Sequence, residues 1–365
     1  MVYRIRDEER DIMLRAMDSA VAGLRSHQNK MDVVGHNIAN VNTFGFKAQT
    51  YTFEEAMYQT ATSSTKAQSN AGGVNAAQYG YGTLMGSIGM DMTASTPSYV
   101  GGFNASIDGE GFFITAKSKL GMSGDAPAGV ASNLFKNFDF DYTRVGQFLL
   151  DSDGYVVDAS GNYVYGFRAE TDVVEGDGGS KVAVTTGYEK NLKPLRVPLA
   201  TATGGVLDSV KVSDTAGSTQ ASASVNIQIN NVGEVTATIK FTVPGKEILD
   251  DKGDPTGKFE PDTMESANVS LGKVAIATFQ NPNGVTKAGG NYYKATDKDN
   301  TGLGVAAAPG DAGSATLMGG FIEASNVDLA KEFADMITTH RGFQANSKMI
   351  TVSDEMLSDL VAMKR

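Results

Sequence analysis

The sequence has no cysteine in its 365 residues, so disulfide bonds, thiolate metal sites and cysteine nucleophiles are excluded. It also has no excess of basic residues. Its 31 Lys and Arg stand against 42 Asp and Glu, and the formal charge of -11 would repel a phosphate backbone. Long hydrophobic runs are missing as well, because no stretch approaches the roughly 20 apolar residues that span a bilayer. We therefore expect neither a nucleic-acid partner nor membrane insertion.

Residues that carry catalysis or bind metals are scarce. The three histidines, His27, His36 and His340, lie in or beside segments that we interpret below as terminal helices, without a nearby ligand set. No Ser or Thr stands in the context of a nucleophile elbow. The best carboxylate pair for a glycan-acting enzyme, Asp108 and Glu110, lies in the turn motif IDGEG. We predict no metal, no cofactor and no enzymatic activity.

Both ends of the chain carry the apolar repeat of long helices that pack along a seam. The repeat near the N-terminus alternates steps of three and four residues, and the repeat near the C-terminus recurs every seventh residue. The first consists of Leu14, Met17, Val21, Leu24, Gln28, Met31, Gly35 and Ile38. The second consists of Leu329, Met336, Phe343, Ile350 and Leu357, with Phe333 and Val361 as companions.

Each of these seams is interrupted by small or polar residues, which pack weakly. The interruptions are Gln28 and Gly35 in the first repeat, and His340, Ser347 and Asp354 in the second. The spacing fits equally a helical hairpin that closes one domain and a coiled coil that forms on assembly. We keep both interpretations, and expect seams this weak to become ordered when subunits assemble.

Polar residues mark one end of each predicted helix. In HNIANVNTFGFK, residues 36–47, asparagines and a glycine tolerate left-handed backbone and compete for backbone hydrogen bonds, so they end the first helix. These residues are Asn37, Asn40, Asn42 and Gly45. Asn326 and Asp328 offer N-cap side chains before the second helix.

The middle of the chain has a β pattern, with apolar and polar residues alternating around Asp-Gly and Ser-Gly turns. We predict an α+β multidomain fold in which long N- and C-terminal helices form a coiled-coil domain. The central domains are mainly β, one inserted in the other. The expected boundaries are a helical assembly domain at 1–47 and 325–365, an extended linker at 48–103, a shared β domain at 104–167 and 271–324, and an inserted β domain at 168–270.

Several motifs along the chain resemble one known family. The segment LRAMDSAVAGLRSHQNKMDVVGHNIANVNTFGFK, residues 14–47, is similar to the N-terminal signature of the bacterial flagellar rod and hook proteins. The segment SNVDLAKEFADMITTHRGFQANSKMITVSDEMLSDLV, residues 325–361, is similar to their C-terminal signature. Between them, IDGEGFF, YTRVGQFLLDSDGYVV and FQNPNGVTKAGGNYYKAT resemble motifs of the family's shared β domain. These motifs stand in the family's order, which makes the resemblance specific.

The resemblance implies an axial subunit of the flagellum, exported without a cleaved signal by the flagellar type III apparatus and polymerised into a hollow tube. The expected partners are further copies of this chain, the flagellar rod, the hook-filament junction proteins, and the hook cap during assembly. The expected location is extracellular, in the flagellar hook. The residues that we predict to form subunit contacts are Leu14, Met17, Val21, Leu24, Met31, Asn37, Ile38, Asn40, Phe44, Phe46, Leu329, Phe333, Met336, Phe343, Ile350 and Leu357.

Within the family, the β-rich block at 168–270 favours a hook type of subunit, because a distal rod subunit usually lacks a comparable block. The distal rod type remains the alternative. A surface adhesin would also explain the Gly-rich hairpins, but it would need a signal peptide or an anchor and no matched helices at both ends. The start MVYRIRDEERDI differs from the usual start of the family, so either Met1 or Met13 is expected as the initiator.

Overall fold

The computed structural model describes residues 2–67, 72–119, 139–175, 181–196, 226–243, 247–249, 255–259, 263–296, 298–311 and 314–362. The chain divides into two compact units, which we treat separately. The helical unit consists of Met1–Thr43, Lys47–Asp91 and Ser325–Arg365. The β unit consists of Phe44–Phe46 and Met92–Ala324.

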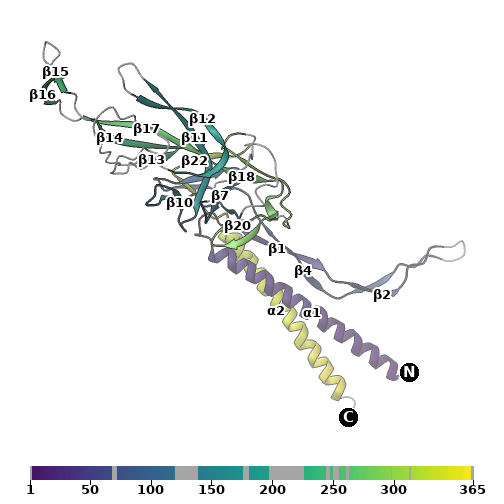
Figure 1. Ribbon diagram of the computed structural model, residues 1–365. Helices are drawn as coiled ribbons and strands as arrows, with labels where there is room; N and C mark the ends of the chain where they lie inside the picture. The colour runs from purple at the N-terminus through teal and green to yellow at the C-terminus, as the bar shows by residue number, and fades with distance from the viewer. Residues whose placement is uncertain are drawn as a thin grey trace. The chain divides into compact units, whose positions relative to one another are not determined.

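Two long helices dominate the helical unit, α1 at Val2–Ala39 and α2 at Leu329–Ala362 (Figure 1). The expected terminal helices are therefore confirmed. Asp328 caps α2 as the sequence suggested, since its Oδ1 accepts hydrogen bonds from the backbone N–H groups of Ala330, at 2.9 Å, and Lys331, at 3.3 Å. The expectation that Asn326 is a cap is wrong, because its side chain binds two other segments, described below.

The helical unit also contains a β-hairpin, whose residues follow α1 and precede α2 in the sequence. Its strands are β1 at Gln49–Glu55, β2 at Tyr58–Thr62, β3 at Ala77–Gly80 and β4 at Thr83–Met90. Strand β1 pairs with β4, and β2 pairs with β3, both antiparallel. The segment that we expected to be an extended linker thus forms paired strands. Its β-branched and aromatic residues, as in TYTF at 50–53, supply the strand preference that the many small residues conceal.

The described strands of the β unit form one large sheet and several small ones. The large sheet has 13 strands among the described residues, and its central path runs β13-β14-β17-β11-β7-β8-β20-β19. Its strands are β7 Phe112–Ala116, β8 Asp141–Thr143, β9 Phe148–Leu150, β10 Val156–Asp158, β11 Tyr163–Glu175, β12 Lys181–Pro194, β13 Asn226–Ile229, β14 Glu234–Val243, β17 Thr263–Val274, β18 Ile276–Phe279, β19 Thr286–Gly289, β20 Tyr292–Lys294 and β21 Gly304–Ala307.

The small sheets pair segments far apart in sequence. Strand β5 at Pro97–Tyr99 pairs with β23 at Phe321–Glu323, and β6 at Ala105–Asp108 pairs with β22 at Thr316–Gly319. A short hairpin joins β15 at Glu247–Leu249 to β16 at Pro255–Phe259. One 3-10 turn, η2, lies at Pro282–Gly284. Strand β5 lies before the expected shared β domain, and it pairs with β23 near the end of that domain.

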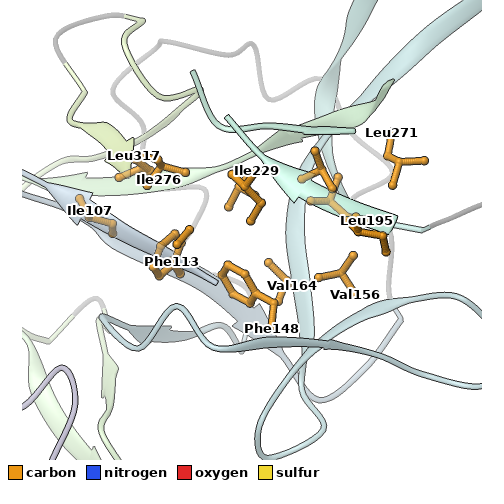
Figure 2. Packing of buried hydrophobic residues seen from close by; sticks show 14 of the residues in the cluster. Ile107, Phe113, Phe148, Val156, Val164, Leu195, Ile229, Leu271, Ile276 and Leu317 are labelled. Carbon is orange, nitrogen blue, oxygen red and sulfur yellow. The ribbon is translucent and has the colours of Figure 1, made fainter. Parts of the chain in front are cut away.

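A single hydrophobic core joins the block at 168–270 to the rest of the β unit. Ile229 of β13 and Val235 of β14 belong to the same buried cluster as Phe113 of β7 and Leu317 of β22. Figure 2 shows Phe113, Ile229 and Leu317 gathered with other members of this cluster between the strands. The long strand β11 pairs with β17 at residues 166–168, at the end of the shared part, and continues into the block, where it pairs with β12.

The shared core bears on the inserted β domain that we expected at 168–270. In the described residues the block has no separate core of its own, because β13 and β14 bury their apolar faces against strands of the shared part. The motif VLDSVKVSD, residues 206–214, alternates apolar and polar residues and predicts a strand of the block. It lies outside the described residues. The domain boundaries that we drew around the block therefore remain a proposal.

We predict that Ile229→Ala weakens the whole β unit. Deleting a buried aliphatic side chain costs about 2 to 5 kcal/mol, and Ile229 is buried in the common core. Urea unfolding, followed by the circular dichroism of the strands, should show one transition at lower urea. The neighbouring Gln228→Ala, at an exposed position of the same strand, is the control and should leave the midpoint nearly unchanged. An additional early transition, with the remainder unaltered, would instead show that the block folds alone.

Candidate assembly surface and polar junction of the helical unit

The two helices of the helical unit pack antiparallel and approach closely. Lys30 on α1 forms an ion pair with Asp335 on α2, with 3.3 Å between Nζ and Oδ1. A Cβ added to Gly342 of α2 would lie 2.7 Å from the ring of His27, a separation that real Cβ atoms do not show. One added to Gly23 would lie 2.5 Å from the Asn346 side chain. Glycine on each helix thus permits the close approach of the other.

The buried residues of the helices are mostly small or polar. On α2, Glu332, Thr339 and Ser353 are buried, and they follow the same side of the helix. The hydroxyls of Thr339 and Ser353 donate to carbonyls of their own helix, at 2.6 and 2.8 Å, so they need no partner on α1. The buried residues of α1 among those described are Ala20, Gly23, Ser26, Val33, Val34 and Asn37.

The expected apolar seams are displaced from this buried line. Leu14 is 39% exposed, Leu329 40% and Phe333 50%. The remaining apolar seam residues are partly exposed, namely Met17, Val21, Leu24, Met31, Ile38, Met336, Phe343, Ile350 and Leu357. The expected polar interruptions Gln28, His340, Ser347 and Asp354 are exposed, so they do not weaken the packing of α1 on α2. The role of the apolar residues as subunit contacts remains a prediction.

Asn37 ties three segments of the helical unit together. Its side-chain amide Nδ2 donates to the carbonyl oxygen of Gln49, at 2.8 Å, and to Oε1 of Glu332, at 3.1 Å. Its Oδ1 accepts the backbone N–H of Gln49, at 2.9 Å. Because Asn37 is only 1% exposed, these bonds satisfy an amide that would be costly to bury alone. The end of α1, the start of β1 and the first turn of α2 therefore meet at one side chain.

Asn326 repeats this arrangement on the other side of the junction. Its Oδ1 accepts the backbone N–H of Ala48, at 2.7 Å, and its Nδ2 donates to the carbonyl oxygen of Asp91, at 2.8 Å. The N–H of Asp91 in turn donates to the carbonyl oxygen of Ala48, at 2.8 Å. Asn40 has a more local role, since its Nδ2 donates to the carbonyl oxygen of His36 and its Oδ1 accepts from Thr43. The polar run at the end of α1 thus builds a junction as well as a helix stop.

The junction encloses a carboxyl group with a shifted pKa. Burial raises the pKa of Glu332 above its ordinary value, and the hydrogen bond from Asn37 acts in the opposite direction. Asp335, one turn further along α2, raises the pKa further through its charge. The amide of Asn37 therefore compensates part of the cost of placing the Glu332 carboxylate at the start of α2, where a helix favours negative charge.

The residues Phe44–Phe46, which follow this run, belong to the β unit. Gly45 has φ of 67°, where a glycine is favoured, and its N–H donates to the carbonyl oxygen of Glu323, at 2.9 Å. Phe46 is 4% exposed, and the Nζ of Lys287 lies 4.6 Å from its ring centroid. Phe44 is 42% exposed. Of the two phenylalanines that we predicted as subunit contacts, Phe46 is thus buried within its own unit.

A buried ion pair that sequence reasoning missed lies in the same unit. Nε of Arg144 is 3.3 Å from Oε2 of Glu323, and the two side chains are 2% and 1% exposed. Nη2 of Arg144 donates to the carbonyl oxygen of Gly109, at 2.8 Å, and Oε1 of Glu323 accepts the N–H of Ser95, at 3.2 Å. Burial lowers the pKa of Arg144, while the charge of Glu323 opposes this. The only available signal was a charged residue inside the strand motif YTRVG.

The residues that were candidates for a metal site or for catalysis lie apart or in a turn. Within them, no three His, Cys, Asp or Glu side chains come together as a group that could hold a metal ion. Asp108 and Glu110 are exposed on either side of Gly109, which has φ of 124°, so they belong to a turn. None of the described helices is long and apolar enough to cross a membrane.

Comparison with known proteins gives matches at both ends of the chain. Residues 17–47 match a family model described as "Flagella basal body rod protein", and residues 318–363 match one described as "Flagellar basal body rod FlgEFG protein C-terminal". The flagellar basal-body rod protein FlgG of Bacillus subtilis is 32% identical, over 97% of this chain and 100% of that protein. The flagellar hook protein FlgE of Borreliella burgdorferi is 29% identical, over 96% of this chain and 100% of that protein. The hook protein FlgE of Escherichia coli is 24% identical over similar shares.

We predict that Asn37→Asp destabilises the helical unit. The change replaces an amide donor by a carboxylate oxygen that faces the Gln49 carbonyl and the Glu332 carboxyl group. A buried acceptor left without a donor costs about 1 to 3 kcal/mol. The midpoint of urea unfolding, followed by helical circular dichroism, should fall accordingly. Gln28→Glu makes the same chemical change at an exposed position of α1 and should have little effect. Equal losses in the two variants would assign the effect to charge alone.

We also predict that the helical unit loses stability below about pH 6.5, the ordinary pKa of histidine. Burial lowers the pKa of His27, and the charge of Lys30 lowers it further, so the unfolded chain takes up the proton first as the pH falls. The thermal midpoint of the helices should therefore fall between pH 7.5 and pH 5.5, and His27→Gln should flatten this dependence. His340→Gln, at an exposed position of α2, is the control. An identical fall in wild type and His27→Gln would exclude His27 as the cause.

Proposed function

The chain belongs to the family of flagellar basal-body rod and hook proteins, and from this premise we propose that it is the structural subunit of the flagellar hook. In this role it polymerises into a hollow curved tube that acts as a flexible joint between rod and filament. The family consists of structural proteins, so the chain is an axial subunit of the bacterial flagellum and not an enzyme. Membership also implies that the chain assembles with copies of itself.

The observation that supports the hook over the rod is the block at 168–270. Its described strands β13 and β14, together with β12, extend the large sheet beyond the strands that the family motifs cover. The relatives from Borreliella burgdorferi and Escherichia coli, both named hook proteins, align along nearly the whole chain, as does the rod protein from Bacillus subtilis, so the alignment length does not separate the two roles. A larger β unit gives each subunit more surface for contacts with its neighbours that can break and form again as the tube bends.

A distal rod subunit is the second candidate, and one observation favours it. The relative from Bacillus subtilis, named a rod protein, is 32% identical, which is higher than the 29% and 24% of the two hook proteins. A rod subunit would use the same helical unit for polymerisation, but it would form a straight shaft. The two functions therefore differ in where the protein lies in the flagellum and in the shape of its tube.

The proposed hook role also implies further protein partners and a location outside the cell. We propose that the tube is joined to the rod at one end and to the hook-filament junction proteins at the other, with a hook cap at the growing tip. Export would proceed through the type III apparatus and the flagellar channel to the outside of the cell. The helical segments at 1–47 and 325–365 would hold the tube together, and the β domains at 104–324 would meet neighbouring copies with weaker contacts.

The absence of cysteine allows a direct test by labelling. Val232→Cys places one thiol in the turn between β13 and β14, where Val232 is 49% exposed. Purified hook and basal-body complexes, treated with maleimide-gold, should carry gold along the curved segment in electron micrographs. Wild-type complexes have no thiol in this subunit and should remain unlabelled there. Gold confined to the straight rod would exclude the hook and establish the second candidate.

Contacts between subunits in the tube could bury the turn that contains Val232 and prevent labelling, so a second position is needed. Leu303 is 38% exposed and lies just before β21, in another part of the β unit. Leu303→Cys should give the same distribution of gold as Val232→Cys. Gold on neither the curved segment nor the rod, with both thiols reactive in the purified subunit, would contradict an axial position in either structure.

A further inference from the structure

One face of the β1–β4 ladder leaves apolar side chains exposed. Phe53 pairs with Met85, and Tyr51 pairs with Ile88 across a register shift, so their side chains share one face, which we name the hairpin face. Phe53 contacts the ring of His27 on α1, at a centroid distance of 5.4 Å. Even so, Phe53, Met85 and Ile88 remain 41%, 50% and 45% exposed. The contact with α1 thus covers only part of the hairpin face.

A two-stranded ribbon of this kind is marginally stable alone, and it gains stability by packing against another element. On one side α1 supplies such packing through the Ser26 hydroxyl, which donates to the carbonyl oxygen of Thr83 at 3.0 Å. The exposed apolar side chains of the hairpin face indicate that a second element covers it in the assembled state.

The helix α2 carries a complementary exposed surface, which we name the α2 face. Phe333 and Ile337 are 50% and 55% exposed, and Arg341 and Lys348 are exposed as well. At 3.6 residues per turn these four positions lie within about 80° of the helix surface. The buried residues Glu332, Thr339 and Ser353 follow another side of the same helix. The α2 face is therefore not used by the packing of α2 on α1.

The charges of the two faces are opposite. Glu55, exposed and two residues after Phe53 in β1, lies on the hairpin face, whereas Glu54 lies on the opposite face with Leu84. Arg341 and Lys348 lie among the apolar residues of the α2 face. Contact between the faces would bring the carboxylate of Glu55 toward a guanidinium or an ammonium group beside an apolar centre. Such complementarity selects a partner and fixes its register.

The symmetry of a tube identifies the partner as a second copy of this chain. An open helical polymer requires a heterologous contact, in which two different surfaces of the subunit meet. We propose that the hairpin face of one subunit docks on the α2 face of the next copy. The inference rests on the proposed self-assembly of an axial subunit and adds which two surfaces meet. It applies equally to a hook and to a rod.

Cysteine cross-linking tests this pairing, because any cross-link must come from an introduced thiol. Met85→Cys marks the hairpin face, and Ile337→Cys marks the α2 face. Tubes assembled from a mixture of the two single variants should yield, on mild oxidation, covalent dimers that contain one chain of each. Tubes of the double variant should yield a ladder of oligomers on a denaturing gel, since each chain then links to two neighbours.

Leu84→Cys provides a matched control. Leu84 is 55% exposed and adjacent to Met85, but it pairs with Glu54 and lies on the opposite face of the ladder. Together with Ile337→Cys it should give no ladder. A ladder from Leu84 and none from Met85 would overturn the proposal, because the outer face of the hairpin would then be the docking surface.

The test also separates this inference from the proposed function. Electron microscopy of the same samples shows whether the variants form tubes. Tubes without cross-links between Met85→Cys and Ile337→Cys would overturn the docking of these two faces while leaving the axial function intact. Subunits of the wild type that form no tubes under any assembly condition would instead count against the proposed function.

Discussion

The helical unit depends on the side-chain amide of Asn37, which pairs with both backbone groups of Gln49. The side chain of Asn37 has one donor group and one acceptor group, and Gln49 offers it a carbonyl oxygen and an N–H in the correct order. This match ends one element and positions the next without a large apolar core at that point. Asn326 applies the same chemistry to Ala48 and Asp91. A carboxylate could not replace either residue, because each amide donates as well as accepts.

This reliance on hydrogen bonds leaves the apolar residues of the helices for other contacts. The buried side of α2 contains Glu332, Thr339 and Ser353, while Phe333 and Ile337 face outward. A subunit that must remain separate before it assembles benefits from an internal packing that needs few large apolar side chains. The formal charge of -11 adds repulsion between free copies. We propose that assembly covers the apolar residues that the fold itself does not use.

The sequence was sufficient to predict the elements governed by local pattern. The helices at both ends, the cap at Asp328 and the alternating strands follow from periodicity and turn chemistry. The exact buried side of α2 could not be predicted, because apolar periodicity indicates which residues need cover but not whether the same chain provides it. The β1–β4 hairpin was hidden by small residues, and the Arg144–Glu323 pair joins residues far apart in sequence. The partners of Asn37 were missed for the same reason.

In the proposed hook, the common core of the β unit determines where the tube can deform as it bends. Strand β11 continues from the shared part into the block, and Ile229 and Val235 belong to the same buried cluster as Phe113 and Leu317. Close-packed interiors resist deformation, and breaking a buried ion pair such as Arg144–Glu323 costs about 3 to 5 kcal/mol. The described part of the β unit should therefore respond to load as one body. The changes in packing that bending requires must then arise outside this core, above all in the contacts between copies.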